Sequence, residues 1–108
     1  MLGVSRVSKI YLREHLVRYT IRRALNLPVD DIDLASIVGS SLLPVMRKVV
    51  AYVACRLVFE KNNHLRCGLC GRGPFTKRGL YLHLTRVHTN EILRLIDEKY
   101  NKYAEKPG

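Results

Sequence analysis

Two cysteines and two histidines in the C-terminal half of the chain have the types and the spacing of a metal site. Cys67, Cys70, His83 and His88 follow the pattern C-x2-C-x12-H-x4-H. Thiolate and imidazole ligands suit Zn²⁺, and two of each complete a tetrahedral set with no open position for a substrate. The pattern therefore predicts one structural Zn²⁺ ion and no catalysis, so we do not expect an enzyme.

The residues around these four side chains constrain the backbone. Gly68 and Gly71 are expected to supply the freedom that a tight turn between the two cysteines needs. His83 and His88 lie about 140° apart on an ideal helix. Both imidazoles can reach one metal only if the helix tightens or ends near Val87–His88.

The same segment, roughly Leu65–Thr89, resembles the two-cysteine, two-histidine (C2H2) zinc finger. The resemblance implies a β-hairpin followed by a helix around one structural zinc. Leu80 takes the place of the family's core leucine. Phe75 corresponds to the core aromatic residue but is displaced by one position, with Pro74 in the usual place, so we expect a shortened or irregular hairpin.

In that family, bases are read mainly from helix positions −1, 3 and 6, which here correspond to Thr76, Gly79 and Leu82. None of these residues makes the bidentate contacts by which Arg reads guanine or Asn reads adenine. We therefore expect the finger to contact phosphates and to supply affinity rather than most of the sequence specificity. The finger residues expected to contact nucleic acid are Arg72, Lys77, Arg78 and Arg86.

The formal charge of +10 is confined to two segments. Residues 1–25 carry six bases and one acid, and residues 66–88 carry five bases and no acid. Residues 26–65 and 89–108 are each neutral. Localised positive charge attracts polyanions, which favours a nucleic acid as partner over a merely solubilising surface. A membrane surface is disfavoured, because no segment joins a basic face to a face rich in Trp and Phe.

A second segment, Asp31–Val53, resembles a helix-turn-helix. Ala35 takes the close-contact position of the first helix, Gly39 takes the turn, and Val45 returns an apolar side chain to the core. The resemblance implies that Leu42–Leu57 is a recognition helix. The residues that it places toward DNA are Ser40, Ser41, Arg47 and Lys48. The alternative is a plain helical hairpin with a glycine cap.

Hydrophobic periodicity predicts a mainly α fold. We expect helices over Ser8–Leu27, Val29–Gly39 and Leu42–Lys61, and a last helix from Thr89 or Asn90 through Tyr103. This divides the chain into a helical, helix-turn-helix-like domain (1–62), a ββα zinc finger (63–89), and a C-terminal helix and tail (90–108).

Local signals refine these elements. Asp30 or Asp31 is expected to cap the second helix and Ser41 the third, and Asn62–Asn63 to stop the third. Cys55 is expected in the core. Within the helix-turn-helix interpretation, Val58–Phe59 and Leu65–Cys67 form a minimal wing.

Size and composition exclude several classes of protein. A chain of 108 residues is too small for a large enzyme core, and its longest apolar run, Val49–Cys55, is too short to span a bilayer. Three cysteines are too few for a disulfide scaffold, and we do not expect Met1–Leu12 to be a secretory signal, because it contains Arg6 and Lys9 and no apolar core segment. We therefore expect an intracellular protein without a membrane partner or a small-molecule substrate.

The whole chain most resembles the small zinc-finger DNA-binding proteins of archaea and of their viruses and plasmids. This resemblance implies binding to duplex DNA and a role in transcriptional regulation. Two alternatives remain open. One is binding to RNA or the ribosome, and the other is a protein-interaction adaptor that docks through Tyr81, Leu82 and the C-terminal helix.

Overall fold

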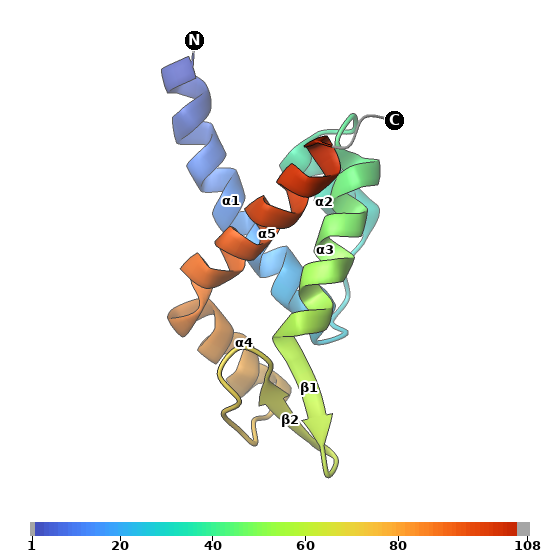
Figure 1. The fold of residues 1–108 in the computed structure, drawn as a ribbon, viewed down its shortest axis with the longest axis vertical. Coiled ribbons are helices and arrows are strands. Elements are labelled where there is room, and N and C mark those ends of the chain that lie inside the picture. The colour runs from blue at the N-terminus through green and yellow to red at the C-terminus, as the bar shows by residue number, and fades with distance from the viewer. Residues whose placement is uncertain (1, 106–108) are drawn as a thin grey trace.

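The fold is mainly α, as predicted (Figure 1). The computed structural model describes the backbone of residues 2–105 and the side chains of residues 13–103. In chain order the elements are α1 (Leu2–Ala24), α2 (Asp31–Val38), α3 (Leu43–Leu57), β1 (Val58–Lys61), β2 (His64–Cys67), α4 (Lys77–Val87) and α5 (Thr89–Glu105).

One hydrophobic core joins the helices to the finger. α1 packs against all four other helices, and α5 lies across both α1 and α3. Met46, Val49, Val50, Val53 and Leu57 of α3 are buried in this core. The core extends without a break to Leu80 and Leu84 of α4 and to Ile92 and Ile96 of α5. The segments predicted as separate units therefore share one core.

The ends of α1 and α2 follow from local sequence. Asn26, with φ 60°, occupies the left-handed position after α1, and the amides of Asn26 and Leu27 donate to the carbonyls of Arg23 and Arg22. The carboxylate of Asp30 caps α2 by accepting a hydrogen bond from the Asp33 amide at 2.9 Å. Gly39 ends α2 with φ 88°, as expected of a glycine at this position.

α3 ends four residues earlier than predicted. Val58–Lys61 forms β1, which pairs antiparallel with β2 in the register Val58↔Cys67 and Lys61↔His64. Asn62 and Asn63 have φ values of 55° and 67°, so they form the two-residue turn of a hairpin rather than a helix stop. Because β1 precedes residue 63, the hairpin crosses the predicted boundary between the helical domain and the finger.

β2 is the central strand of the finger. One edge pairs with β1, and on the other edge the Phe75 amide donates to the Leu65 carbonyl at 2.9 Å and the Cys67 amide to the Arg72 carbonyl at 2.9 Å. The strand that follows the cysteines is thus reduced to one bridge, between Leu65 and Phe75. This is the shortened hairpin that the displacement of Phe75 predicted.

Two further expectations were wrong. Ser41 does not cap α3, because the helix begins at Leu43 and Leu42 occupies the N-cap position without a side-chain hydrogen bond. Cys55 is exposed rather than buried, because the core-facing side of α3 is already formed by Val53, Ala54 and Leu57.

No single helix in residues 2–105 has both the length and the apolar character needed to cross a membrane. α2 and α3 meet those criteria only when taken together, and they are bent by 109° at their junction.

Gly68 joins the finger to the end of α3. Its amide donates to the Leu57 carbonyl at 2.8 Å, and a Cβ at this position would lie 2.1 Å from the carbonyl oxygen of Arg56. The sequence pointed to backbone freedom, but what requires glycine at position 68 is this close approach. Backbone freedom is the requirement at Gly71, where φ is 79° and a Cβ would meet open space.

Replacing these two glycines with alanine should therefore give different losses. Gly71→Ala should lower the free energy of unfolding by about 1–2 kcal/mol, because a residue with a Cβ is disfavoured in the left-handed conformation. Gly68→Ala should cost more, because the new methyl group overlaps rigid backbone and the finger must separate from α3. Chemical denaturation of the two variants and the parent compares them, and an equal or smaller loss for Gly68→Ala would contradict the close-approach role.

Candidate metal centre

The four residues predicted to bind a metal come together. Their ligand atoms all lie within 4.8 Å of one another. The Cys70 Sγ and His83 Nε2 atoms are 3.4 Å apart, close to the separation of about 3.3–3.8 Å between the ligand atoms of a tetrahedral zinc ion. The cluster can therefore hold one metal ion.

The two cysteines occupy a short turn at the end of β2. The Gly71 amide donates to the Cys67 carbonyl at 2.8 Å, which closes the turn. The Leu69 amide points back at the Cys67 Sγ, at 3.4 Å. Backbone N–H groups directed at sulfur stabilise a thiolate, so this turn is suited to a metal-bound cysteine.

The two histidines come from the body and the end of α4. Thr76 caps this helix by accepting a hydrogen bond from the Gly79 amide at 2.9 Å, which fixes where the helix begins. The helix ends at Val87, and His88 has φ −115° and ψ 14°. The interruption predicted from the spacing of His83 and His88 is therefore present, and it turns the second imidazole toward the first.

Burial differs across the cluster. Cys67 and His88 are buried, His83 is half-buried and Cys70 is exposed. The Phe75 ring stacks on the His83 imidazole with centroids 4.9 Å apart, and the two imidazoles meet edge to face at 5.0 Å. The displaced aromatic residue thus packs directly against a ligand and limits its rotation.

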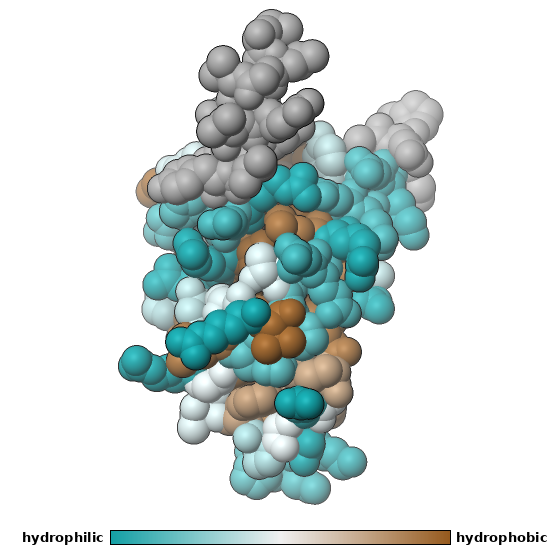
Figure 2. All heavy atoms as spheres, turned by 90° about the vertical axis from the view of Figure 1, so that its left-hand side faces the viewer, coloured by the Kyte–Doolittle hydropathy of each residue, from teal (hydrophilic) through white to brown (hydrophobic). Residues whose placement is uncertain are grey.

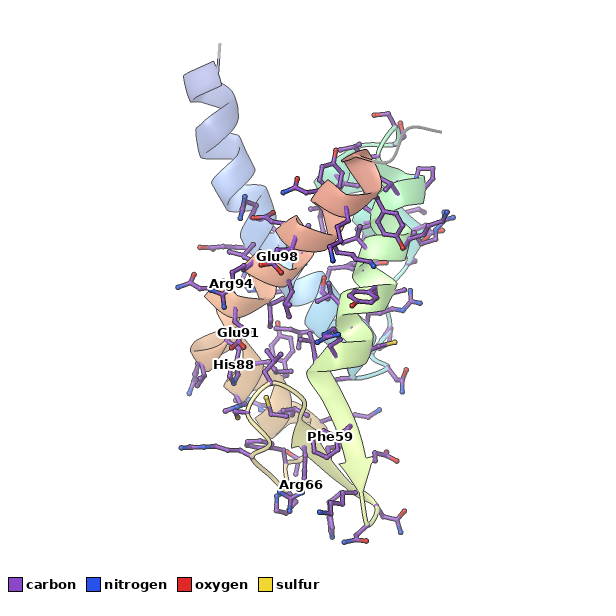
Figure 3. All side chains as sticks on the ribbon, in the orientation of Figure 1. Phe59, Arg66, His88, Glu91, Arg94 and Glu98 are labelled. Atoms are coloured by element: carbon purple, nitrogen blue, oxygen red, sulfur yellow. The ribbon has the colours of Figure 1, made fainter. Side chains whose placement is uncertain are left out.

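Glu91 orients the second histidine. Its Oε1 atom lies 2.8 Å from the Nδ1 of His88, at the junction of α4 and α5 (Figure 3). This contact leaves the Nε2 of His88 to face the cysteines, where it is buried without a hydrogen-bond partner. A buried ring nitrogen needs a partner, and a metal ion bound by the cluster would supply it. The four residues therefore fit the zinc ion that the sequence implies. The sequence analysis missed Glu91, although an acid three residues after a ligand, in the first turn of a helix, was a usable signal.

The pKa shifts favour the deprotonated, metal-binding form at Cys70 and oppose it at Cys67 and His88. Burial acts to raise the pKa of Cys70, but the Arg72 amide and the nearby side chains of His88, His83 and Cys67 lower it to about 6. Burial raises the pKa of the Cys67 thiol, against the lowering effect of the Leu69 and Cys70 amides. Burial opposes a rise in the pKa of His88, but Cys70 and Glu91 outweigh it. The centre therefore holds one thiolate readily near neutral pH, before a metal contributes its own charge.

The residues predicted to bind nucleic acid form two separate groups. Ser41, Arg47 and Lys48 are exposed around the start of α3, and the finger residues Arg72, Lys77, Arg78 and Arg86 are exposed beyond its other end. α3 has 15 residues, so roughly 20 Å of helix separates the groups. The 109° bend between α2 and α3, across a turn of a few residues, falls within the range of a helix-turn-helix.

Comparison with protein-family models, with curated proteins and with solved structures found no match to this chain.

The contact between Glu91 and His88 predicts an effect on metal affinity. Glu91→Ala should weaken binding by about 10–100-fold, because the imidazole loses the partner that fixes its orientation and raises its basicity. The matched control is Glu98→Ala, which removes the same charge from an exposed position on α5. Competition for Zn²⁺ against a chromogenic chelator measures both, and equal affinities in the two variants would rule out a role for Glu91.

Proposed function

We propose that this chain is a zinc-stabilised DNA-binding protein that acts in transcriptional regulation. The observation that carries the proposal is a four-ligand centre that orients a helix whose exposed side is basic. Two thiolates and two imidazoles in a closed set favour Zn²⁺ over the harder cations Mg²⁺ and Ca²⁺, which prefer oxygen ligands. Four protein ligands leave no open position, so the ion would be structural.

The ion, when bound, supplies a crosslink between segments that otherwise meet only through packing. Cys67 and Cys70 belong to the turn that contacts the end of α3 through Gly68. His83 lies in α4, and His88 lies where α4 gives way to α5. Holding these ligands together would fix α4 against the hairpin and set the direction in which α5 leaves.

The charge on α4 supports DNA as the partner. Lys77, Arg78 and Arg86 are exposed, and none of them forms an ion pair with a carboxylate in the described part of the chain. The family's reading positions carry no free polar side chain, because the Thr76 hydroxyl caps the helix and the other two residues are Gly79 and Leu82. Such a helix would contact phosphates, and the protein would regulate by occupying DNA.

The adaptor alternative is less well supported. The docking face expected for an adaptor includes the apolar side of the C-terminal helix, and this side of α5 is buried against other helices of the same chain. Ile92 and Ile96 are buried where α5 packs on α1 and α3. Tyr81 and Leu82 are each only half-exposed.

Zinc should be necessary for the finger to fold. Cys67→Ser should abolish stoichiometric zinc binding and unfold at least residues 65–88, because structural zinc contributes on the order of 10–16 kcal/mol in small fingers. Cys55→Ser removes an exposed thiol outside the cluster and should retain one zinc per chain. Native mass spectrometry gives the stoichiometry and amide NMR spectra the fold. A zinc-free parent with unchanged spectra in that region would refute the structural role.

The finger helix should contribute affinity without specificity. The double variant Lys77→Ala/Arg78→Ala should reduce the slope of log K against log salt by up to about 2, since each phosphate contact contributes about 0.9 on duplex DNA. Affinity should fall alike for all sequences. Lys99→Ala/Lys102→Ala removes the same charge from the other end of the last helix and should leave the slope unchanged.

Fluorescence anisotropy with duplexes of different sequence measures both variants, with a structured RNA as competitor. If Lys77→Ala/Arg78→Ala lost its preference for one sequence while binding random DNA normally, phosphate anchoring would be wrong. If RNA displaced the duplex at equal concentration, the partner would be RNA.

A further inference from the structure

The C-terminal half of α1 presents a row of arginines on its outer side. Arg18 and Arg22 are exposed and lie one turn apart, so they stand on the same ridge of the helix. Val17 and Ile21, the residues just before each of them, are buried in the core. Packing of α1 therefore fixes the side of the helix on which these two arginines stand.

This row borders the outer face of α4. A groove of about 200 Å³ between α1 and the α4–α5 junction is lined by Glu14, Val17, Arg18, Thr85 and Thr89. The Thr85 hydroxyl donates to the Leu82 carbonyl within α4, and the Thr89 hydroxyl, at the start of α5, donates to the Thr85 carbonyl of α4. Arg18 of α1 and Thr85 of α4 thus line the same groove, although they are far apart in sequence.

Thr85 belongs to the side of α4 that carries its arginines. At 100° per residue, Arg78, Thr85 and Arg86 fall within one side of the helix, and the buried Leu80 and Leu84 fall on the other. The exposed side of α4 therefore continues across the groove onto α1. Figure 2 views this flank of the molecule, where hydrophilic side chains surround small hydrophobic areas.

The bases on this surface are not neutralised. In the part of the chain whose side chains the structure describes, the ion pairs are Arg13–Asp97, Arg47–Asp31 and His88–Glu91. None of the four arginines at positions 18, 22, 78 and 86 takes part in them. The one acid on the groove is Glu14, which lies one turn before Arg18.

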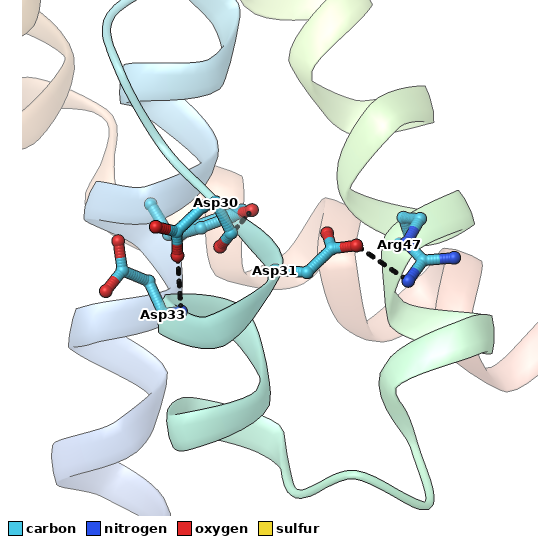
Figure 4. A network of polar contacts seen from close by, with 5 residues as sticks. Asp30, Asp31, Asp33 and Arg47 are labelled. Atoms are coloured by element: carbon cyan, nitrogen blue, oxygen red, sulfur yellow. Dashed lines mark hydrogen bonds and ion pairs between the residues drawn. The ribbon is translucent and has the colours of Figure 1, made fainter.

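The surface around the start of α3 has the opposite character. Asp30, Asp31 and Asp33 lie at the start of α2, and Asp31 Oδ2 accepts from Arg47 Nη2 at 2.8 Å (Figure 4). In the described part of the chain Asp31 pairs with Arg47, and Asp30 and Asp33 have no ion-pair partner. Burial raises the pKa of Tyr19 beneath this surface, Asp31 raises it further, and Arg23 lowers it in part, so the three acids together impose a local negative potential that Arg23 partly offsets. Phosphates are repelled by such a field.

We propose that α1 and α4 form one composite DNA-backbone-binding surface, made by Arg18 and Arg22 together with Arg78 and Arg86, and that the α2–α3 surface does not contact DNA. This inference rests on the proposed DNA binding and adds where the duplex lies. It makes the helical part of the chain a contributor to affinity through α1, whereas the helix-turn-helix resemblance places DNA on α3.

The experiment compares two pairs of exposed bases at equal loss of charge. Binding of a random-sequence duplex is measured by fluorescence anisotropy across a salt series for the zinc-loaded parent, Arg18→Ala/Arg22→Ala and Arg47→Ala/Lys48→Ala. The first pair should reduce the salt slope by up to about 2 and weaken binding on the order of tenfold or more at 0.1 M salt. The second pair should match the parent. Glu14→Gln, which removes the one acid from the groove, should strengthen binding.

The outcomes separate this inference from the proposed function. If the α3 pair reduces the slope and the α1 pair does not, the composite surface is wrong and DNA binding stands. If both pairs reduce it equally, the effect is net charge alone and the composite surface is again wrong. If the zinc-loaded parent shows no salt-dependent binding to the duplex, the proposed function itself fails. Zinc content and far-UV circular dichroism equal to the parent confirm that each variant is folded.

Discussion

The convergence of four ligand side chains is the constraint on which the rest of this structure depends. Cys67 and Cys70 lie in the turn at the end of β2, His83 lies on α4 and His88 directly follows it, and their ligand atoms meet within 4.8 Å. Two contacts extend the cluster into neighbouring helices: the Gly68 amide donates to the end of α3, and Glu91 of α5 holds His88. Within the finger, Phe75 stacks on His83. In this way the cluster fixes the hairpin, α4 and the start of α5 relative to one another, which matters in a small chain with a limited hydrophobic core.

The same arrangement also determines which side of α4 is exposed to solvent. Leu80 and Leu84 enter the core, and the two histidines turn toward the cysteines. The remaining side of the helix carries its arginines into solvent. α1 packs against the same helix, so the basic residues of two segments distant in sequence come to lie on one flank. Three of the nine acids, by contrast, lie at the start of α2, where Asp30 caps the helix and Asp31 pairs with Arg47. Separation of charge between two surfaces is thus a consequence of packing.

The sequence analysis was most successful where a residue's role depends on near neighbours. Asp30 caps α2, Gly39 ends it, and the helix break between His83 and His88 follows from their spacing alone. It failed where two local signals competed. The pair Asn62–Asn63 is equally compatible with the end of a helix and with the turn of a hairpin. The hairpin forms because β1 can pair with β2. Cys55 was expected inside because apolar residues surround it in the middle of a helix, but other side chains already form the buried side of α3.

The sequence by itself determined which four side chains could hold a metal ion, the mainly helical content and the location of the positive charge along the chain. These depend on residue type and spacing, which a linear pattern records. Only the tertiary structure decided that Gly68 abuts the Arg56 carbonyl, that Glu91 orients His88, and that α1 borders the outer side of α4. Each of these contacts joins two different elements and depends on the angle at which those elements pack. That angle is set by how the side chains of several helices fill one shared core, and no short stretch of sequence encodes it.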